Sequence, residues 1–226
     1  MANLPEDFIR ETRLLMGETR FNSYLEAFNE EAPVSIRLNP KKSLEFRVES
    51  LEFATAPQEG HKNSQLNPVP WCPEGIYLSD RPQFTFDPLF HAGCYYVQEA
   101  ASMFITHILR ELSNLSPLNA LDLCAAPGGK STAMRSVLPE GSTLVSNEPV
   151  PSRAQILLEN ITKWGAPNCI VTNNYPRDFR KAKVKFDLIL CDVPCSGEGM
   201  FRKDPATIGE WGLQNVEKCW RLQRDI

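Results

Sequence analysis

Apolar residues at helical spacing mark the start of the chain. Between Pro5 and about Asn29 they recur on one helical face, and Gly17 interrupts the pattern, which predicts two short helices. Three β-like runs follow, the last two separated by a Pro- and Asn-rich stretch from Ala56 to Pro73: VSIRLNP (34–40), LEFRVESLEFA (44–54) and GIYLS (75–79). We therefore expect N-terminal helices over 1–32 and a small α+β module over 33–94.

The second half of the chain alternates between helical and strand patterns. One continuous helical pattern runs from Tyr95 to Leu115, and Ser116 and Pro117 end it. Predicted strands and helices then alternate: strands at 120–124, 143–146, 169–172 and 186–191, helices at 130–138, 152–164 and 213–226. This alternation is typical of βαβ units, so we expect residues 95–226 to hold a parallel sheet of order 3-2-1-4, covered by helices on both faces. The apolar fourth strand would then be an exposed edge that needs protection.

Composition places this pattern in a broad class. The 226 residues are 42% hydrophobic and 23% charged, which is typical of a globular protein and excludes a disordered, collagen-like or disulfide-rich chain. Seven cysteines without metal-ligand pairs indicate free thiols in a reducing compartment. The sequence shows neither a secretory signal nor an apolar run of about 18 residues, so we expect a cytoplasmic protein without a membrane partner.

Charge is distributed unevenly along the chain. The formal net charge of -4 argues against a protein that coats nucleic acid through bulk positive charge. Residues 1–116 are acidic on balance and residues 117–226 slightly basic, so the second half is the more favourable place for an anionic ligand. A basic run from Arg177 to Lys185 could contact RNA phosphates or form a solvated face.

A turn of small residues follows the first strand of the predicted parallel sheet. The segment LDLCAAPGGKS, from Leu121 to Ser131, leads from a strand into a helix whose first N–H groups favour a carboxylate or phosphate. A nucleoside-triphosphate P-loop is one interpretation, but Cys124 stands where its first glycine belongs. The dinucleotide pattern G-x-G-x-x-G is absent. A tight turn without a ligand and a nucleoside-cofactor turn are the other two interpretations.

Acidic and amide side chains follow the next two predicted strands. Glu148 ends the second strand, where a carboxylate can accept hydrogen bonds from ribose hydroxyls, although a lone Glu at a strand end is usually solvated. Asn173 and Asn174 follow the third strand and could face an adenine by the same logic. Coupled to the turn, Glu148 is predicted to be a ribose ligand.

A second motif follows the fourth predicted strand. In FDLILCDVPCSGEGMFRKDP (186–205), Asp192 stands at the carboxyl end of the strand and Cys195 follows in a Pro-Cys pair. Ligands of open α/β sheets lie outside the carboxyl ends of the strands, so both residues should border the same crevice as the first turn. Taken alone, Asp192 could instead cap a turn and Cys195 could be a buried small apolar residue.

The two motifs together carry a family resemblance. DLCAAPGGKS and DVPCSGEGMFRKD resemble motifs I and IV of the RNA cytosine-5 methyltransferases, in particular the bacterial small-subunit rRNA branch. The resemblance extends upstream through YYVQEAASM (95–103), RLNP (37–40) and the LP-x-x-F start. It implies an α/β fold: a Rossmann-like S-adenosylmethionine-dependent methyltransferase domain with an incomplete parallel sheet, preceded by the helical and α+β module. It also implies small-subunit rRNA, or the small ribosomal subunit, as partner.

The resemblance carries site roles onto this sequence. Glu148 would hold the ribose hydroxyls and Asp192 would sit between the cofactor and the target base. Asn173 or Asn174 stands where the family often has an acid for the adenine. The methionine and ribose parts of S-adenosylmethionine would be cradled by Cys124, Ala125, Ala126, Pro127, Gly128, Gly129 and Lys130.

The expected chemistry is covalent. A thiolate adds to cytosine C6, which activates C5 for methyl transfer, while Asp192 hydrogen-bonds the base and stabilises the adduct. The resemblance implies that Cys195 assists product release and that the main nucleophile is a Thr-Cys thiol, expected beyond Ile226. We therefore expect this chain to bind cofactor without methylating RNA. Two alternatives remain: Cys195 is itself the nucleophile, as in DNA-type enzymes, or the chain is a non-catalytic RNA-binding or assembly module.

Other residues carry weaker predictions. His91 and Cys94 could suggest a metal, but two ligands without partners do not make a site, so no metal is expected. Trp71, Tyr95 and Tyr96 could stack on bases, although aromatic residues mostly pack in cores.

Overall fold

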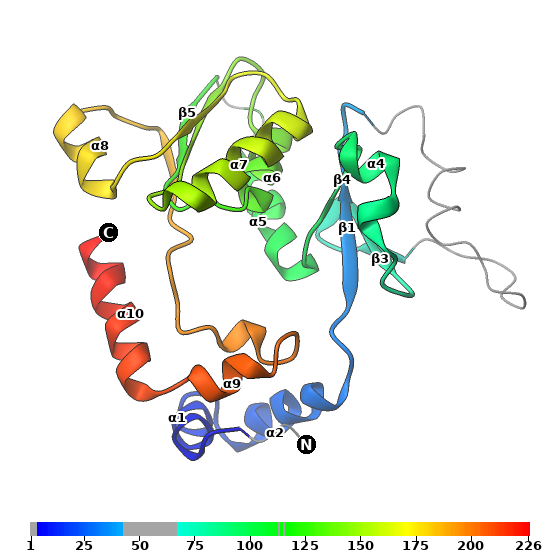
Figure 1. Cartoon of the computed structure of the whole chain (residues 1–226), viewed down its shortest axis with the longest axis vertical. Helices are drawn as coiled ribbons and strands as arrows, with labels where there is room; N and C mark the ends of the chain where they lie inside the picture. The colour runs from blue at the N-terminus through cyan, green and yellow to red at the C-terminus, as the bar shows by residue number, and fades with distance from the viewer. Residues whose placement is uncertain (1–3, 43–66, 113, 115) are drawn as a thin grey trace, which may run out of the picture. The chain divides into compact units, whose positions relative to one another are not determined.

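The chain folds into two compact units in a computed structural model, which describes residues 4–42, 67–112, 114 and 116–226 (Figure 1). One unit joins the N-terminal segment up to Ala32 to Val193–Ile226, and the other spans Pro33–Asp192. The boundary between the units therefore falls inside the second motif. The three domains expected from the sequence stay a prediction.

The unit that contains both chain ends is helical. Its two N-terminal helices confirm the prediction, and Gly17 separates them at a φ of +73°, where glycine is favoured. The Phe8 ring centroid lies 5.2 Å from that of Phe201 and 5.3 Å from that of Trp211. The N-terminal helices thus share a core with the segment after Cys195. The elements of this unit are α1 (Glu6–Met16), α2 (Glu18–Glu26), η1 (Ala27–Asn29), η3 (Glu198–Met200), α9 (Ala206–Glu210) and α10 (Leu213–Asp225).

The second unit begins with an antiparallel sheet of order β2-β3-β1-β4. The predicted run 44–54 lies outside the described residues. The stretch from Ala56 to Pro73 was expected only to separate strands, which is wrong for its last part, because that part forms β2 and begins β3. Pro68 is tolerated there because β2 is an edge strand in the described sheet. The elements are β1 (Val34–Leu38), β2 (Asn67–Val69), β3 (Cys72–Leu78), η2 (Phe84–Phe86), α4 (Pro88–His91) and β4 (Tyr95–Val97).

The helix predicted from Tyr95 to Leu115 begins later than expected. Residues 95–97 form β4, which pairs antiparallel with β1, and α5 (Ala100–Arg110) follows. Tyr and Val favour a pleated, half-buried strand once a partner strand is available. The apolar spacing of this segment was interpreted as one helix because that partner lies almost sixty residues earlier, at Ile36–Leu38.

A parallel sheet of order β7-β6-β5-β8 follows, which confirms the predicted order 3-2-1-4. The strands are β5 (Asn119–Asp122), β6 (Thr143–Asn147), β7 (Cys169–Thr172) and β8 (Leu188–Leu190), and the helices are α6 (Gly129–Val137), α7 (Pro151–Trp164) and α8 (Pro176–Ala182). The sequence did not predict α8, a short basic helix in which Pro176 occupies the first turn and Asp178 accepts a hydrogen bond from the Tyr175 N–H.

Helices cover one face of the parallel sheet (Figure 1). α5 and α6 pack on it through Leu109, Met134 and their neighbours, and α7 contributes Leu157 and Ile161. Coverage of both faces was predicted and is only partly correct for the described residues, because Leu121 is buried on the opposite face whereas Ile170 and Ile189 there stay about half exposed. Strand register aligns these two with Val145 and Leu121 in one apolar row. No helix among the described residues combines the length and apolar character needed to cross a membrane.

Candidate cofactor site

The first motif forms a tight turn at the carboxyl end of β5. We call residues Cys124–Lys130 the cofactor turn. Its backbone is held by hydrogen bonds from the Ala125 N–H to the Asn147 carbonyl, 2.7 Å, and from the Gly128 N–H to the Ala125 carbonyl, 2.8 Å. Gly128 has a φ of +111°, and a Cβ there would lie 3.2 Å from Leu157 Cδ1, so glycine is required. The N–H groups that begin α6 lack intrahelical acceptors and favour an anionic group.

Two buried polar atoms beside the turn have no partner among the described residues: Asp122 Oδ1 and Gln98 Nε2. The other Asp122 oxygen accepts a 2.6 Å hydrogen bond from the Ser131 hydroxyl. Burial raises the pKa of Asp122 to about 6. The side chain of Gln98 packs beside the first residue of α6: a Cβ on Gly129 would lie 3.5 Å from Gln98 Nε2. Buried polar atoms without partners are costly, and these two have capacity for a hydrogen bond with a polar ligand at the turn.

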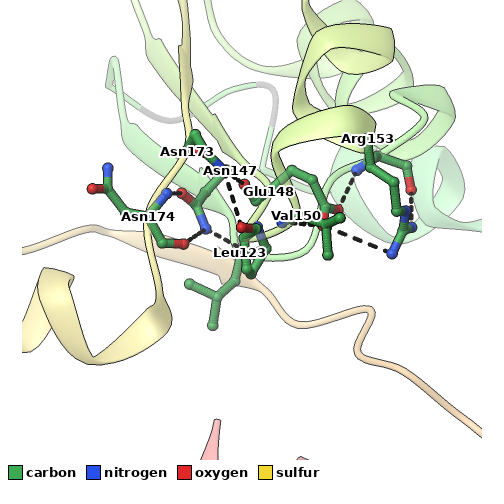
Figure 2. Close-up of polar contacts among 9 residues, drawn as sticks. Leu123, Asn147, Glu148, Val150, Arg153, Asn173 and Asn174 are labelled. Carbon is green, nitrogen blue, oxygen red and sulfur yellow. Dashed lines mark hydrogen bonds and ion pairs between the residues drawn. The ribbon is translucent and has the colours of Figure 1, made fainter.

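Glu148 lies at the carboxyl end of β6 and is almost fully buried. Its carboxylate accepts hydrogen bonds from the Ala126 N–H, 3.3 Å, and the Val150 N–H, 3.0 Å. Arg153 approaches the same carboxylate at 3.7 Å and donates to the Ala126 carbonyl at 2.9 Å (Figure 2). Glu148 therefore braces the cofactor turn. A carboxylate has about four acceptor positions, so capacity remains for ribose hydroxyls.

Asn147 ties three strand ends together, a role that the sequence analysis missed. Its amide group donates to the Leu123 carbonyl, 3.0 Å, and the Asn174 carbonyl, 2.9 Å. Its oxygen accepts from the Thr172 hydroxyl, 2.9 Å, and the Asn174 N–H, 3.0 Å. Figure 2 shows these contacts converging beside Glu148. The available signal was its place in the chain, a polar residue directly before Glu148 at the end of an apolar strand.

The two asparagines after β7 differ in their surroundings. Asn173 donates to the backbone carbonyls of Glu148, 2.7 Å, and Pro149, 3.0 Å. The side chain of Asn174 points away from Asn147 and Glu148 (Figure 2). Asn173 thus fixes the loop after β6, and an adenine contact by either asparagine stays a prediction.

Lys130 and Asp192 bring the two motifs together. The Lys130 ammonium lies 2.6 Å from Asp192 Oδ2, with both side chains partly exposed. Lys130 belongs to the first turn of α6 and Asp192 follows β8, the strand next to β5. The expectation that Asp192 borders the same edge as the first turn is therefore met. This ion pair orients the carboxylate at the carboxyl ends of the strands.

The thiols of the two motifs differ in exposure. Cys195 is exposed and belongs to the helical unit. In the same unit, Glu198 accepts hydrogen bonds from the Ser196 hydroxyl, 2.6 Å, and the Trp211 indole, 2.8 Å. Burial alone would raise the pKa of Glu198, but these hydrogen bonds lower it. Burial raises the pKa of Cys124 to about 11, so that thiol stays protonated at neutral pH.

A buried arginine supports the start of α6 and was not predicted. Arg37, from the RLNP segment, donates to Gln98 Oε1, 2.8 Å, the Thr132 hydroxyl, 2.6 Å, and the Gly129 carbonyl, 3.3 Å. Its guanidinium also lies 4.5 Å from the Trp164 ring centroid. These contacts join the antiparallel sheet to the helix that begins at the cofactor turn.

The weaker candidates have local partners. The His91 ring hydrogen-bonds the Thr85 carbonyl at 2.8 Å, and no group of three or more candidate metal ligands occurs in the part of the chain that the structure describes. The Trp71 indole donates to the Ala100 carbonyl at 2.7 Å, and Tyr95 donates to Asp87. The basic run from Arg177 to Lys185 lies on and after α8 and is mostly exposed.

Solved structures define the class of this fold. "Crystal Structure of PH0851" aligns with a TM-score of 0.83 at 21% identity and covers 98% of this chain and 48% of that one. NSun6 from Pyrococcus horikoshii with SFG aligns with a TM-score of 0.77 at 18% identity, covering 99% of this chain and 78% of that one. The second unit has the Rossmann-like fold of S-adenosylmethionine-dependent methyltransferases.

Sequence comparison defines the family. A family model described as 16S rRNA methyltransferase RsmB/F matches residues 112–226, and one described as the N-terminal domain of 16S rRNA methyltransferase RsmF matches residues 4–100. The chain belongs to the RsmB/F family. Ribosomal RNA small subunit methyltransferase F of Pectobacterium carotovorum subsp. carotovorum (strain PC1) is 34% identical over 231 residues, covering 100% of this chain and 46% of that protein. Its namesake from Vibrio cholerae serotype O1 (strain M66-2) is 33% identical, with 99% and 47% covered. The chain spans about half the length of these relatives.

Proposed function

We propose that this chain binds S-adenosylmethionine as the methyl donor for methylation of cytosine C5 in small-subunit rRNA in the cytoplasm. One observation carries the proposal: Lys130 of the cofactor turn pairs with Asp192 of the second motif at 2.6 Å, at the strand edge where Glu148 also lies. Family membership supports the reaction class. The RNA partner is either the free small-subunit rRNA or the assembled small subunit.

The residues present fit S-adenosylmethionine. The N–H groups that begin α6 are suited to its methionine carboxylate, and Glu148 has acceptor capacity for its ribose hydroxyls. Asp122 Oδ1 and Gln98 Nε2, which have no partner in the described part of the chain, lie beside the same turn. When bound, the cofactor supplies a methyl group from its sulfonium. Cys124–Lys130 would cradle it, and Asn173 would hold the loop that carries Glu148.

Asp192 is proposed to hold the target base. Its carboxylate can accept a hydrogen bond from the cytosine amino group, and Lys130 keeps the carboxylate at the strand edge while the base enters. The base must leave its stack to reach this edge. Cys195, three residues further along the chain, is proposed to assist product release.

Calorimetric titration with S-adenosylmethionine tests the cofactor site. We expect Gly128→Val to abolish binding, because a side chain there meets Leu157 and strains the turn. Glu148→Gln should weaken binding by about 1–3 kcal/mol, because a neutral amide replaces the buried acceptor. Glu140→Gln, at an exposed acid, is the matched control. Unchanged affinity in both site variants, with unaltered thermal unfolding, would contradict the assignment.

A trapping experiment tests the role of Cys195. In RNA that carries 5-fluorocytosine, the C5 substituent cannot leave as a proton, so the attacking thiol stays bonded to C6. After incubation with S-adenosylmethionine, mass spectrometry of the digested protein identifies any modified cysteine. The release role predicts that the Cys195 peptide carries no RNA. An adduct on Cys195 would make it the nucleophile and overturn that role.

A further inference from the structure

A cavity of about 430 Å³ lies in the second unit beside the cofactor turn. Pro127 contributes to it from the turn, Asn160 and Lys163 contribute from α7, and the rest of its wall comes from Arg81–Phe90 and β4. Its volume lies within the range of small-ligand sites. Neither Glu148 nor Asp192 lines it, so it is separate from the edge proposed above for the cofactor.

The wall of the cavity combines aromatic rings with positive charge. Phe84, Phe90 and Tyr96 line it. The Arg81 guanidinium lies 5.8 Å from the Phe84 ring centroid, and the Lys163 ammonium lies 4.0 Å from the Phe90 ring centroid. The lining residues include no carboxylate, although the chain as a whole has a net charge of -4. The local charge therefore selects an anionic ligand that also presents a flat apolar face.

Carboxylates near this wall lie outside its lining. The Asp87 carboxylate, next to the Phe84–Phe86 turn, accepts hydrogen bonds from the Leu89 N–H, 2.8 Å, and the Tyr95 hydroxyl. Lys42 adds a further cation close by, since its ammonium donates to the Lys163 carbonyl at 2.8 Å. Glu159, one helical turn before Lys163 on α7, interacts electrostatically with the Lys163 ammonium but does not line the cavity.

Two polar side chains connect the cavity to the cofactor turn. Asn160 donates to the Pro127 carbonyl at 2.8 Å, and the Tyr96 hydroxyl donates to the same carbonyl at 3.2 Å. Burial raises the pKa of Tyr96 to about 12, so its hydroxyl is a donor at neutral pH. The remaining acceptor of the Asn160 amide can receive a hydrogen bond from the exocyclic amine of a base.

We propose that this cavity binds an unpaired nucleotide of the RNA substrate, with the base on the aromatic wall and the phosphate between Arg81 and Lys163. The substrate class rests on the proposed function, whereas the site rests on the cavity itself. Aromatic stacking and cationic phosphate contacts are the usual elements of single-strand recognition. Because Pro127 belongs to both sites, a nucleotide held here also stabilises the back of the cofactor turn.

Fluorescence anisotropy with a labelled twelve-nucleotide single-stranded RNA tests the site in the intact chain. The double variant Arg81→Gln/Lys163→Gln should bind at least about tenfold more weakly, and its slope of log affinity against log salt should fall by roughly 0.7, the value for the one phosphate that the two cations hold. Arg20→Gln/Lys218→Gln removes two exposed charges in the other unit and is the matched control. Equal affinity losses in both double variants would overturn the proposal.

Crosslinking locates the RNA independently of affinity. RNA with 4-thiouridine at each position in turn is irradiated with the protein, and crosslinked peptides are identified by mass spectrometry. The proposal predicts crosslinks to Phe84, Phe90 or Tyr96, and crosslinks confined to other segments would overturn it. Phe84→Leu, which keeps an apolar side chain, should reduce the crosslink yield.

The two proposals fail in distinguishable ways. If the parent chain binds S-adenosylmethionine while the cavity variants bind RNA as the control does, the cavity proposal fails alone. If the parent chain does not bind the cofactor but the cavity variants lose RNA affinity, the methyltransferase proposal fails and the nucleotide site stands.

Discussion

Arg37 places a positive charge in the interior of the second unit, where no carboxylate of the described residues forms an ion pair with it. Burial lowers its pKa to about 10, so the guanidinium stays charged at neutral pH. Its hydrogen bonds to neutral oxygens and its position over Trp164 replace the missing ion pair. The planar fork of arginine suits this geometry, whereas lysine offers a single ammonium.

Replacing Arg37 tests this account. Arg37→Met should lower the free energy of unfolding by roughly 3 kcal/mol, because the acceptors on Gln98 and Thr132 lose buried, charge-assisted hydrogen bonds. Cofactor affinity should fall as well, since the start of α6 loses its support. Urea unfolding and calorimetry measure the two effects, and Arg20→Met is the exposed control. A variant as stable as the control would show that Arg37 is not a structural support.

Asp122 makes stability depend on pH. Its folded pKa of about 6 lies above the ordinary 3.8, so the folded protein binds more protons than the unfolded chain between these values. Protonation of Asp122 therefore adds about 3 kcal/mol to the free energy of unfolding. This stabilisation is complete below about pH 4 and is lost as the pH rises through 6. Asp122→Asn should flatten that part of the stability profile. An unchanged profile in chemical unfolding from pH 4 to 7, compared with Asp225→Asn, would refute the effect.

At the scale of elements, local pattern predicted most of the parallel sheet. Strands β5 to β8 and helices α6 and α7 have clear periods and short connections, so their order followed from right-handed βαβ rules. β4 was missed because its partner β1 lies far away in the sequence. β2 was missed because it is only three residues long and contains a proline, in a stretch rich in turn-forming residues. The motifs indicated Lys130, Glu148 and Asp192, but not Arg37 or Asn147. Those two act through contacts with distant or backbone groups, which no sequence motif records.

The partly exposed face of the parallel sheet is a liability for this chain. Ile170 and Ile189 are each about half exposed, and β8 is an edge strand of the described sheet. Exposed apolar strands promote self-association. Ile189→Lys should therefore reduce self-association in analytical ultracentrifugation without lowering thermal stability. The control Lys185→Ile should not reduce self-association. A parent chain that is monomeric at high concentration would contradict this expectation.

At the scale of the whole molecule, the segment after Cys195 depends on the first thirty residues of the chain. Phe201 and Trp211 pack on Phe8, so the Pro-Cys loop and the N-terminal helices form one unit. The apolar spacing of these helices predicted a separate domain, because periodicity shows which face of a helix is apolar but not what that face packs against. Deletion of α1 should accordingly expose Trp211, which intrinsic fluorescence would detect.

The discontinuous unit also sets an order of folding. Its two segments are separated by residues 33–192, and closing an open chain of that length costs roughly 4–5 kcal/mol of entropy. The cost falls once the intervening unit has folded and holds its ends at a fixed separation. The parallel sheet should therefore form first and the helical unit last. Pulse-labelled hydrogen exchange during refolding should detect protection of the β5 and β6 amides before that of the α1 amides. Protection in the reverse order would show that the two terminal segments associate without a folded sheet between them.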